Sequence, residues 1–134
     1  MAISESVEPL KNMRPQMRGE FLICSMPPEL LTGDLIAGAM AVFREREGIS
    51  LIVPELSRAK LPQHAKASAP LVLITLNVGP DAEAVAFLAV ITGALAKEGI
   101  AAKAMSAFHH THLLVPRTKA EKAMEILKGM AKPK

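Results

Sequence analysis

The chain has 134 residues and a formal net charge of +3, and aromatic residues make up only 3% of it, with neither Trp nor Tyr. Because half of its residues are hydrophobic, the core must be built from aliphatic side chains, alanine and methionine. A weak positive charge with so few aromatic residues for base stacking argues against a nucleic-acid partner. The length suits one compact domain, or two small ones that share a core.

The only cysteine, Cys24, lies in the apolar run 21–26 and has no second cysteine to pair with. We interpret it as a buried structural thiol and expect a reducing, cytoplasmic location. The first residues lack the basic region of a signal peptide. The longest apolar stretch, residues 84–96, is too short to cross a bilayer, so no membrane partner is expected.

In the first half, a weakly patterned lead-in over residues 1–19 precedes an apolar run, 20–26, that predicts a strand. Residues 27–38 contain two prolines and two glycines, so they predict no more than one or two poor helical turns. Residues 39–54 then form two apolar runs around a polar tip, which is typical of a hairpin. The Lys- and Ala-bearing residues up to 60 predict a helix after it.

The second half begins with a predicted strand over residues 71–78, which is followed by the clearest helix signal in the chain. Gly79, Pro80 and Asp81 supply an N-cap, a first-position proline and a first-turn acid. Gly99 is the expected C-terminal stop. The apolar stripe of this helix is predicted to comprise Ala84, Leu88, Ile91 and Leu95, with Val85, Phe87 and Val90 off it.

A second hairpin is predicted over residues 101–116, followed by a last helix. Thr118 and Glu121 have the spacing of a capping box at its start. Its apolar face is predicted to consist of Ala120, Met124, Leu127 and Met130. Residues 132–134 are expected to be a loose tail.

The two halves repeat one another. Residues 39–60 align without a gap on residues 101–122, so that the run 51–54 falls on 113–116 and both end at a proline. The resulting element order, βαββα twice, predicts an α+β, ferredoxin-like fold with antiparallel sheets and helices on one face. We expect a first unit over residues 1–65 and a second over 66–134.

Six segments carry a family resemblance: GEFLICSM, AVFREREGISLIVP, ITLNV, AVAFLAVITGALAKEGIA, FHHTHLLVP and KAEKAMEIL. Together they resemble the bacterial tandem ACT-domain proteins, over residues 10–130, and are distantly similar to the arginine-sensing CASTOR proteins of animals. The resemblance implies two tandem βαββα(β) ACT units and a non-enzymatic, regulatory protein. Its implied partner is a small-molecule ligand, an amino acid by analogy, bound at the interface between ACT units. No cofactor is implied.

The resemblance also implies where the ligand binds, because ACT units take effectors near the turn between the first strand and first helix. On this chain the implied ligand-binding residues are Asn77, Val78, Gly79, Pro80, Asp81, Ala82, Glu83 and Ala84. Similar proteins usually have Tyr-Tyr-His-Asp-His at the second hairpin. Here the outer histidines of that pattern are His110 and His112, which we add to the ligand-binding candidates, while His109 and Thr111 depart from it.

Residue chemistry leaves several alternatives open at these positions. On a regular strand His110 and His112 share a face, but two nitrogens are fewer than the three or four ligands of a zinc site, so no metal site is predicted. Asp81 is either a first-turn acid or a contact for a ligand ammonium group. Arg44 at the first hairpin either holds a ligand carboxylate or bridges to an acid on another unit.

Two further functions therefore remain beside the regulatory one. The chain could be a ligand-free structural module that acts by dimerisation, or a metal-dependent enzyme that uses His110 and His112. The sequence leaves open whether a homodimer forms. It also leaves open which ligand is bound.

Overall fold

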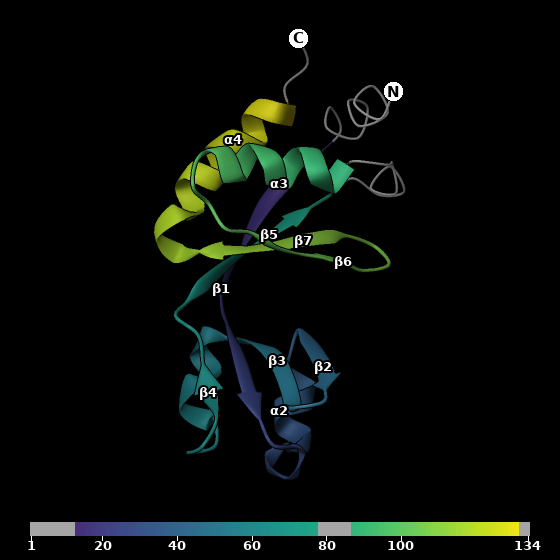
Figure 1. Ribbon diagram of the computed structural model, residues 1–134, viewed down its shortest axis with the longest axis vertical. Helices are drawn as coiled ribbons and strands as arrows, with labels where there is room; N and C mark the ends of the chain where they lie inside the picture. Colours follow the sequence, from purple (N-terminus) through teal and green to yellow (C-terminus); the bar gives the residue numbers. More distant parts are fainter. Residues whose placement is uncertain (1–12, 78–86, 132–134) are drawn as a thin grey trace. The chain divides into compact units, whose positions relative to one another are not determined.

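The computed structural model describes residues 13–77 and 87–131, which form two compact units (Figure 1). The small unit comprises Gly19–Leu71, and the large unit comprises residues 13–18 together with 72–77 and 87–131. Strand β1 (Pro15–Met26) contributes to both units, and Gly19, at the boundary, has a positive φ of 109°. The predicted division into ACT-like units, 1–65 and 66–134, stays a prediction.

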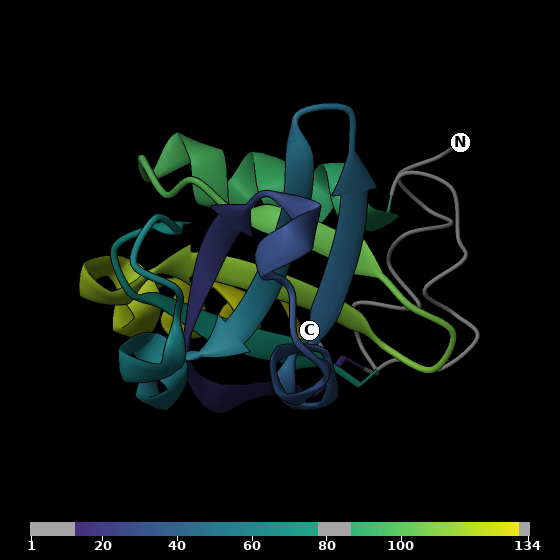
Figure 2. The same ribbon diagram turned by 90° about the horizontal axis from the view of Figure 1, so that it is seen from below.

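The small unit contains strands in the order β2-β3-β1, with the short strand β4 paired to β1. Figure 2 shows β2 and β3 side by side as a long hairpin. The predicted strand over 20–26 and hairpin over 39–54 are confirmed, although β1 begins earlier than expected. The elements after β1 are η1 (Pro28–Leu30), α2 (Gly33–Gly38), β2 (Ala41–Glu45), β3 (Gly48–Pro54), η2 (Glu55–Lys60) and β4 (Lys66–Ala67).

Alternate residues of β1 and β3 build the core of the small unit. The antiparallel register places Leu22 opposite Val53, Cys24 opposite Leu51 and Met26 opposite Ile49. All six side chains are buried and pack with Leu35 of α2. Because burial disfavours the thiolate, the pKa of Cys24 is raised, with a smaller opposing effect of a hydrogen bond to the Leu51 backbone. The expected buried structural thiol is therefore confirmed.

Gly48 opens β3 in a conformation that other residues rarely adopt. Its φ is +153°, and a Cβ at this position would lie 2.8 Å from the carbonyl oxygen of Met26. The close approach follows from the register, since Met26 pairs with Ile49, the next residue. Glycine is therefore required where this hairpin meets β1.

The large unit contains strands in the order β1-β5-β7-β6, with helices α3 and α4 over one face of the sheet (Figure 1). Its elements after β1 are β5 (Leu71–Leu76), α3 (Phe87–Lys97), β6 (Lys103–Ser106), β7 (Thr111–Pro116), η4 (Arg117–Lys119) and α4 (Ala120–Ala131). Helices on one face of an antiparallel sheet match the predicted ferredoxin-like α+β arrangement. None of the helices within 13–77 and 87–131 is long and apolar enough to span a membrane.

The core of the large unit lies between this sheet and the two helices. On α3 the fully buried residues are Phe87, Ile91 and Leu95, whereas Leu88 is only half-buried. The predicted stripe was therefore wrong in excluding Phe87. On α4 the buried residues are Ala120, Ala123 and Leu127, whereas the predicted Met124 and Met130 lie at the margin of the core.

Two predicted helix starts need correction. The segment after β3 is a 3₁₀ helix of six residues, η2, and ends before Leu61. After β7, the 3₁₀ helix η4 precedes α4. The N-cap residue of η4 is Pro116, and no side chain caps η4 with a hydrogen bond. The expected capping box of Thr118 and Glu121 does not start this helix.

The repeat seen in the sequence has a structural counterpart. Strands β3 and β7 both end at a proline, and Pro54 and Pro116 have nearly equal backbone angles, with φ of −57° and −55°. Each proline begins a 3₁₀ helix. The buried residues Leu51 and Leu113 occupy matching positions of the two strands.

Candidate functional site

A hydrogen bond between two strands of the large unit fixes the best-placed histidine. The Thr75 hydroxyl of β5 lies 3.0 Å from Nδ1 of His112 on β7. The neighbours of these residues, Ile74 and Leu113, belong to the core beneath the helices. Because alternate residues of a strand point to opposite faces, Thr75 and His112 lie on the face that the helices leave uncovered. Thr75 is fully buried there, and His112 is half-buried.

The surroundings of His112 favour its neutral form. Burial lowers its pKa from the ordinary value of 6.5, and electrostatic interactions with His110 and Arg18 lower it further. A neutral imidazole has one donor and one acceptor nitrogen, and here the Thr75 hydroxyl occupies Nδ1. The other ring nitrogen can therefore contact a ligand beside the fixed charge of Arg18.

His110 lies at the tip of the second hairpin, before β7 begins. Its ring centroid is 6.1 Å from that of His112 and 6.4 Å from that of His109. Its Nδ1 atom is buried and has no hydrogen-bond partner among the described residues. His110 and His112 therefore lie close together, as predicted. His110 stands in the loop of the hairpin, however, and not on a regular strand.

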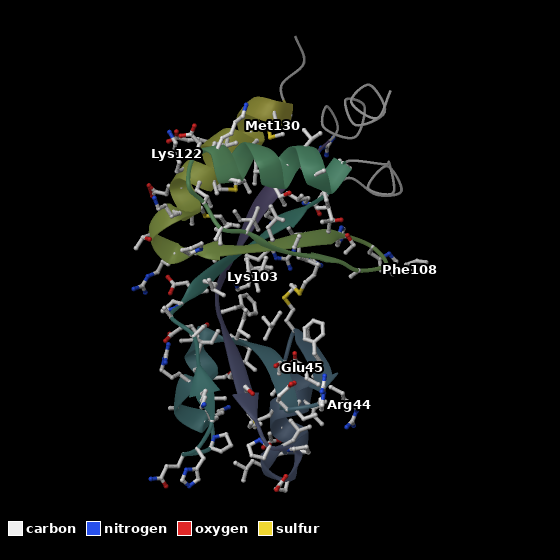
Figure 3. The ribbon with its side chains drawn as sticks, in the orientation of Figure 1. Arg44, Glu45, Lys103, Phe108, Lys122 and Met130 are labelled. Carbon is white, nitrogen blue, oxygen red and sulfur yellow. The ribbon has the colours of Figure 1, made fainter. Side chains whose placement is uncertain are left out.

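The remaining tip residues are polar or exposed. The loop is closed by a hydrogen bond of 2.9 Å from the Ala107 amide to the His110 carbonyl oxygen. At the strand ends, the hydroxyls of Ser106 and Thr111 are 3.4 Å apart. Phe108 is 95% exposed, extends away from the hairpin (Figure 3) and packs edge-on against His109.

Asn77 is the one residue of the predicted turn that the structure describes. Its side-chain Nδ2 donates to the Arg14 carbonyl oxygen at 2.8 Å, and its backbone amide donates to the same oxygen at 3.4 Å. This contact ties the end of β5 to the start of β1. The other candidates of the turn, Val78, Gly79, Pro80, Asp81, Ala82, Glu83 and Ala84, lie outside the described residues.

Potential metal ligands do not gather into a larger group. Within residues 13–77 and 87–131, no three side chains of His, Cys, Asp or Glu come together at metal-binding distance. His110 and His112 together supply two imidazoles.

The first hairpin lies in the small unit. Its turn consists of Arg46 and Glu47, since Glu45 still pairs with Gly48. The Glu45 carboxylate accepts a hydrogen bond from the Ser50 hydroxyl. Arg44 is exposed on β2 (Figure 3). That it holds a ligand carboxylate stays a prediction.

Sequence reasoning missed two residues of the site, Arg18 and Thr75. Arg18 fell within the lead-in that precedes the predicted strand, but β1 begins at Pro15 and carries it into the large unit. Thr75 stood in an aliphatic run that reads as pure core. The sequence did offer one indication of its role, the hydroxyl group. A buried hydroxyl needs a hydrogen-bond partner, so a polar side chain is expected next to it.

Comparison with known proteins identifies an ACT domain within the chain. The family model described as "ACT domain" matches residues 71–129, which begin at β5 and end within α4. No curated protein sequence matches the chain.

Solved structures are similar over most of the chain. A Vibrio cholerae protein of unknown function, described as a possible transport protein, is 28% identical, with a TM-score of 0.82 over 98% of this chain and 100% of that one. An Agrobacterium tumefaciens protein is 19% identical, with a TM-score of 0.72 over 90% of each chain. The regulatory subunit of aspartate kinase from Thermus flavus is 11% identical, with a TM-score of 0.59 over 89% of this chain and 96% of that one. The fold is thus the ferredoxin-like fold of ACT domains.

Proposed function

We propose that this chain is a non-enzymatic, cytoplasmic regulatory protein with two tandem ACT-like units, and that it binds a free amino acid. The observation that carries the proposal is the ACT domain match over residues 71–129, because ACT domains are typically regulatory modules that bind amino acids. The aspartate kinase regulatory subunit has the same fold at low identity and supports only the fold.

The charges of the large unit suit the carboxylate end of such a ligand. Arg18 supplies a permanent positive charge, and its guanidinium can hold a carboxylate with two parallel hydrogen bonds. Neutral His112, held by Thr75, offers a further ring nitrogen. We assign the carboxylate to Arg18 and His112.

A thermal-shift screen of the twenty common amino acids at millimolar concentration tests the proposal. A ligand at a hundred times its Kd should stabilise the folded chain by about 2.7 kcal/mol. Arg18→Gln and His112→Gln should each reduce the shift, whereas Arg14→Gln, just before the start of β1, should keep it. If no amino acid raises the melting temperature, the proposal is wrong and the ligand-free dimerisation module becomes the better description. Light scattering then measures whether a homodimer forms.

A further inference from the structure

The small unit contains a cavity of about 390 Å³, within the size range of small-molecule sites. Helices α2 and η2 and strand β3 form its walls. The residues that line it are Thr32, Asp34, Leu35, Gly38, Val53, Ser57 and Lys60. All of them belong to Gly19–Leu71, so the cavity is separate from the residues around His112.

Two opposite charges line this cavity without neutralising each other. Asp34 stands in the first turn of α2, and Lys60 ends η2. Neither forms an ion pair or hydrogen bond with any residue of 13–77 or 87–131. In the same η2, by contrast, Arg58 pairs with Glu55 at 3.2 Å. Among the described residues, the Asp34 carboxylate and the Lys60 ammonium group thus have no charged partner, and both residues are exposed to solvent.

Neutral groups complete the lining. The Thr32 oxygen accepts a hydrogen bond from the Leu35 amide at 3.2 Å, which leaves the hydroxyl hydrogen free to donate. Leu35 and Val53 are buried and provide an apolar floor. Gly38 also lines the cavity, and a Cβ built there would meet nothing within 4 Å.

We propose that this cavity is a second binding site, and that it takes a small zwitterion such as a free α-amino acid. Asp34 receives the ligand's ammonium group, and Lys60 receives its carboxylate, with Ser57 and Thr32 as neutral donors. The ligand's side chain lies toward Leu35 and Val53. The ligand class is shared with the proposed function, but the site and its residues are different.

Amide NMR spectra recorded with each of the twenty common amino acids test this second site. At least one amino acid should shift the amide signals of Asp34, Leu35, Ser57 and Lys60. The N-acetyl and carboxamide forms of that amino acid, each lacking one charge, should bind more weakly. Asp34→Asn and Lys60→Gln should each weaken binding about tenfold or more, as expected when one charge-assisted hydrogen bond is lost.

Matched controls separate the lining residues from the general charge of the unit. Glu29→Gln and Lys66→Gln change exposed residues of η1 and β4 that do not line the cavity, so binding should be unchanged. Gly38→Leu fills the open space without altering charge and should abolish binding. Each variant's own spectrum shows whether it is folded.

The same spectra distinguish the second site from the proposed function. Shifts confined to the signals around Asn77 and His112 would support the proposed function and overturn the second site. Shifts confined to the cavity would support the second site and overturn the assignment of the ligand carboxylate to Arg18 and His112. The second site is also overturned if no amino acid moves the cavity signals, or if Asp34→Asn and Lys60→Gln bind like the wild type.

Discussion

The hydroxyl of Thr75 and Nδ1 of His112 are 3.0 Å apart, and this bond joins the end of β5 to the start of β7. Replacing Thr75 with valine keeps the shape of the side chain and removes the hydroxyl. Because Thr75 is fully buried, Thr75→Val should lower the free energy of unfolding by about 1–2 kcal/mol in urea titrations.

Thr92→Val is the matched control for this substitution. Thr92 donates to the Leu88 carbonyl oxygen at 2.8 Å on α3, an acceptor that belongs to its own helix. Its loss should therefore change the free energy of unfolding by less than about 0.5 kcal/mol. Equal losses in the two variants would show that the bond to His112 contributes nothing of its own.

The lowered pKa of His112 makes stability depend on pH. In the unfolded chain the imidazole takes up a proton near its ordinary pKa of 6.5, whereas in the folded chain it does so only at lower pH. The contribution of His112 is therefore fully present above pH 6.5, and it is lost as the pH falls from 6.5 toward the folded value. The free energy of unfolding of the wild type and of His112→Gln is measured in urea at several pH values. Below pH 6.5 the wild type should lose stability relative to the variant as the pH falls. Parallel pH dependences in the two proteins would contradict this.

Arg18 accounts for part of this lowered pKa, after burial and His110. Arg18→Gln should therefore raise the pKa of His112 part of the way back to 6.5. An NMR titration of the imidazole C–H signals measures it directly. Arg14→Gln removes a neighbouring positive charge of the same sequence segment, and it should leave the titration of His112 where it was. If the pKa of His112 rose equally in both variants, the net charge of the protein, rather than Arg18 itself, would be responsible for the lowered pKa.

The sequence predicts most strands of the fold because their apolar residues alternate. Leu22, Cys24 and Met26 alternate with less buried residues, and the register places each opposite a core residue of β3. The start of β1 could not be predicted in this way. Pro15 and Gly19 interrupt the pattern, and the residues between them are mostly exposed.

The candidate site was only partly predictable for a related reason. His110 and His112 stand close together in the sequence, so a family pattern and strand geometry point to both. Arg18 and Thr75 act on His112 from distant segments, and only the folded sheet brings their effects together. The opposite charges of Asp34 and Lys60 carried no signal, because their common cavity depends on how α2 and η2 pack.

Gly48 provides a test of the small unit that does not depend on any ligand. Gly48→Ala places a Cβ 2.8 Å from the Met26 carbonyl oxygen and requires an L-residue at a φ of +153°. The variant should lose about 1–3 kcal/mol in the free energy of unfolding. Gly129→Ala is the control, since a Cβ there meets nothing within 4 Å and the residue lies inside α4. That variant should gain about 0.5–1 kcal/mol, because alanine favours helix over glycine. If Gly48→Ala were as stable as the wild type, the strands β1 and β3 could not meet in the register that places Met26 opposite Ile49.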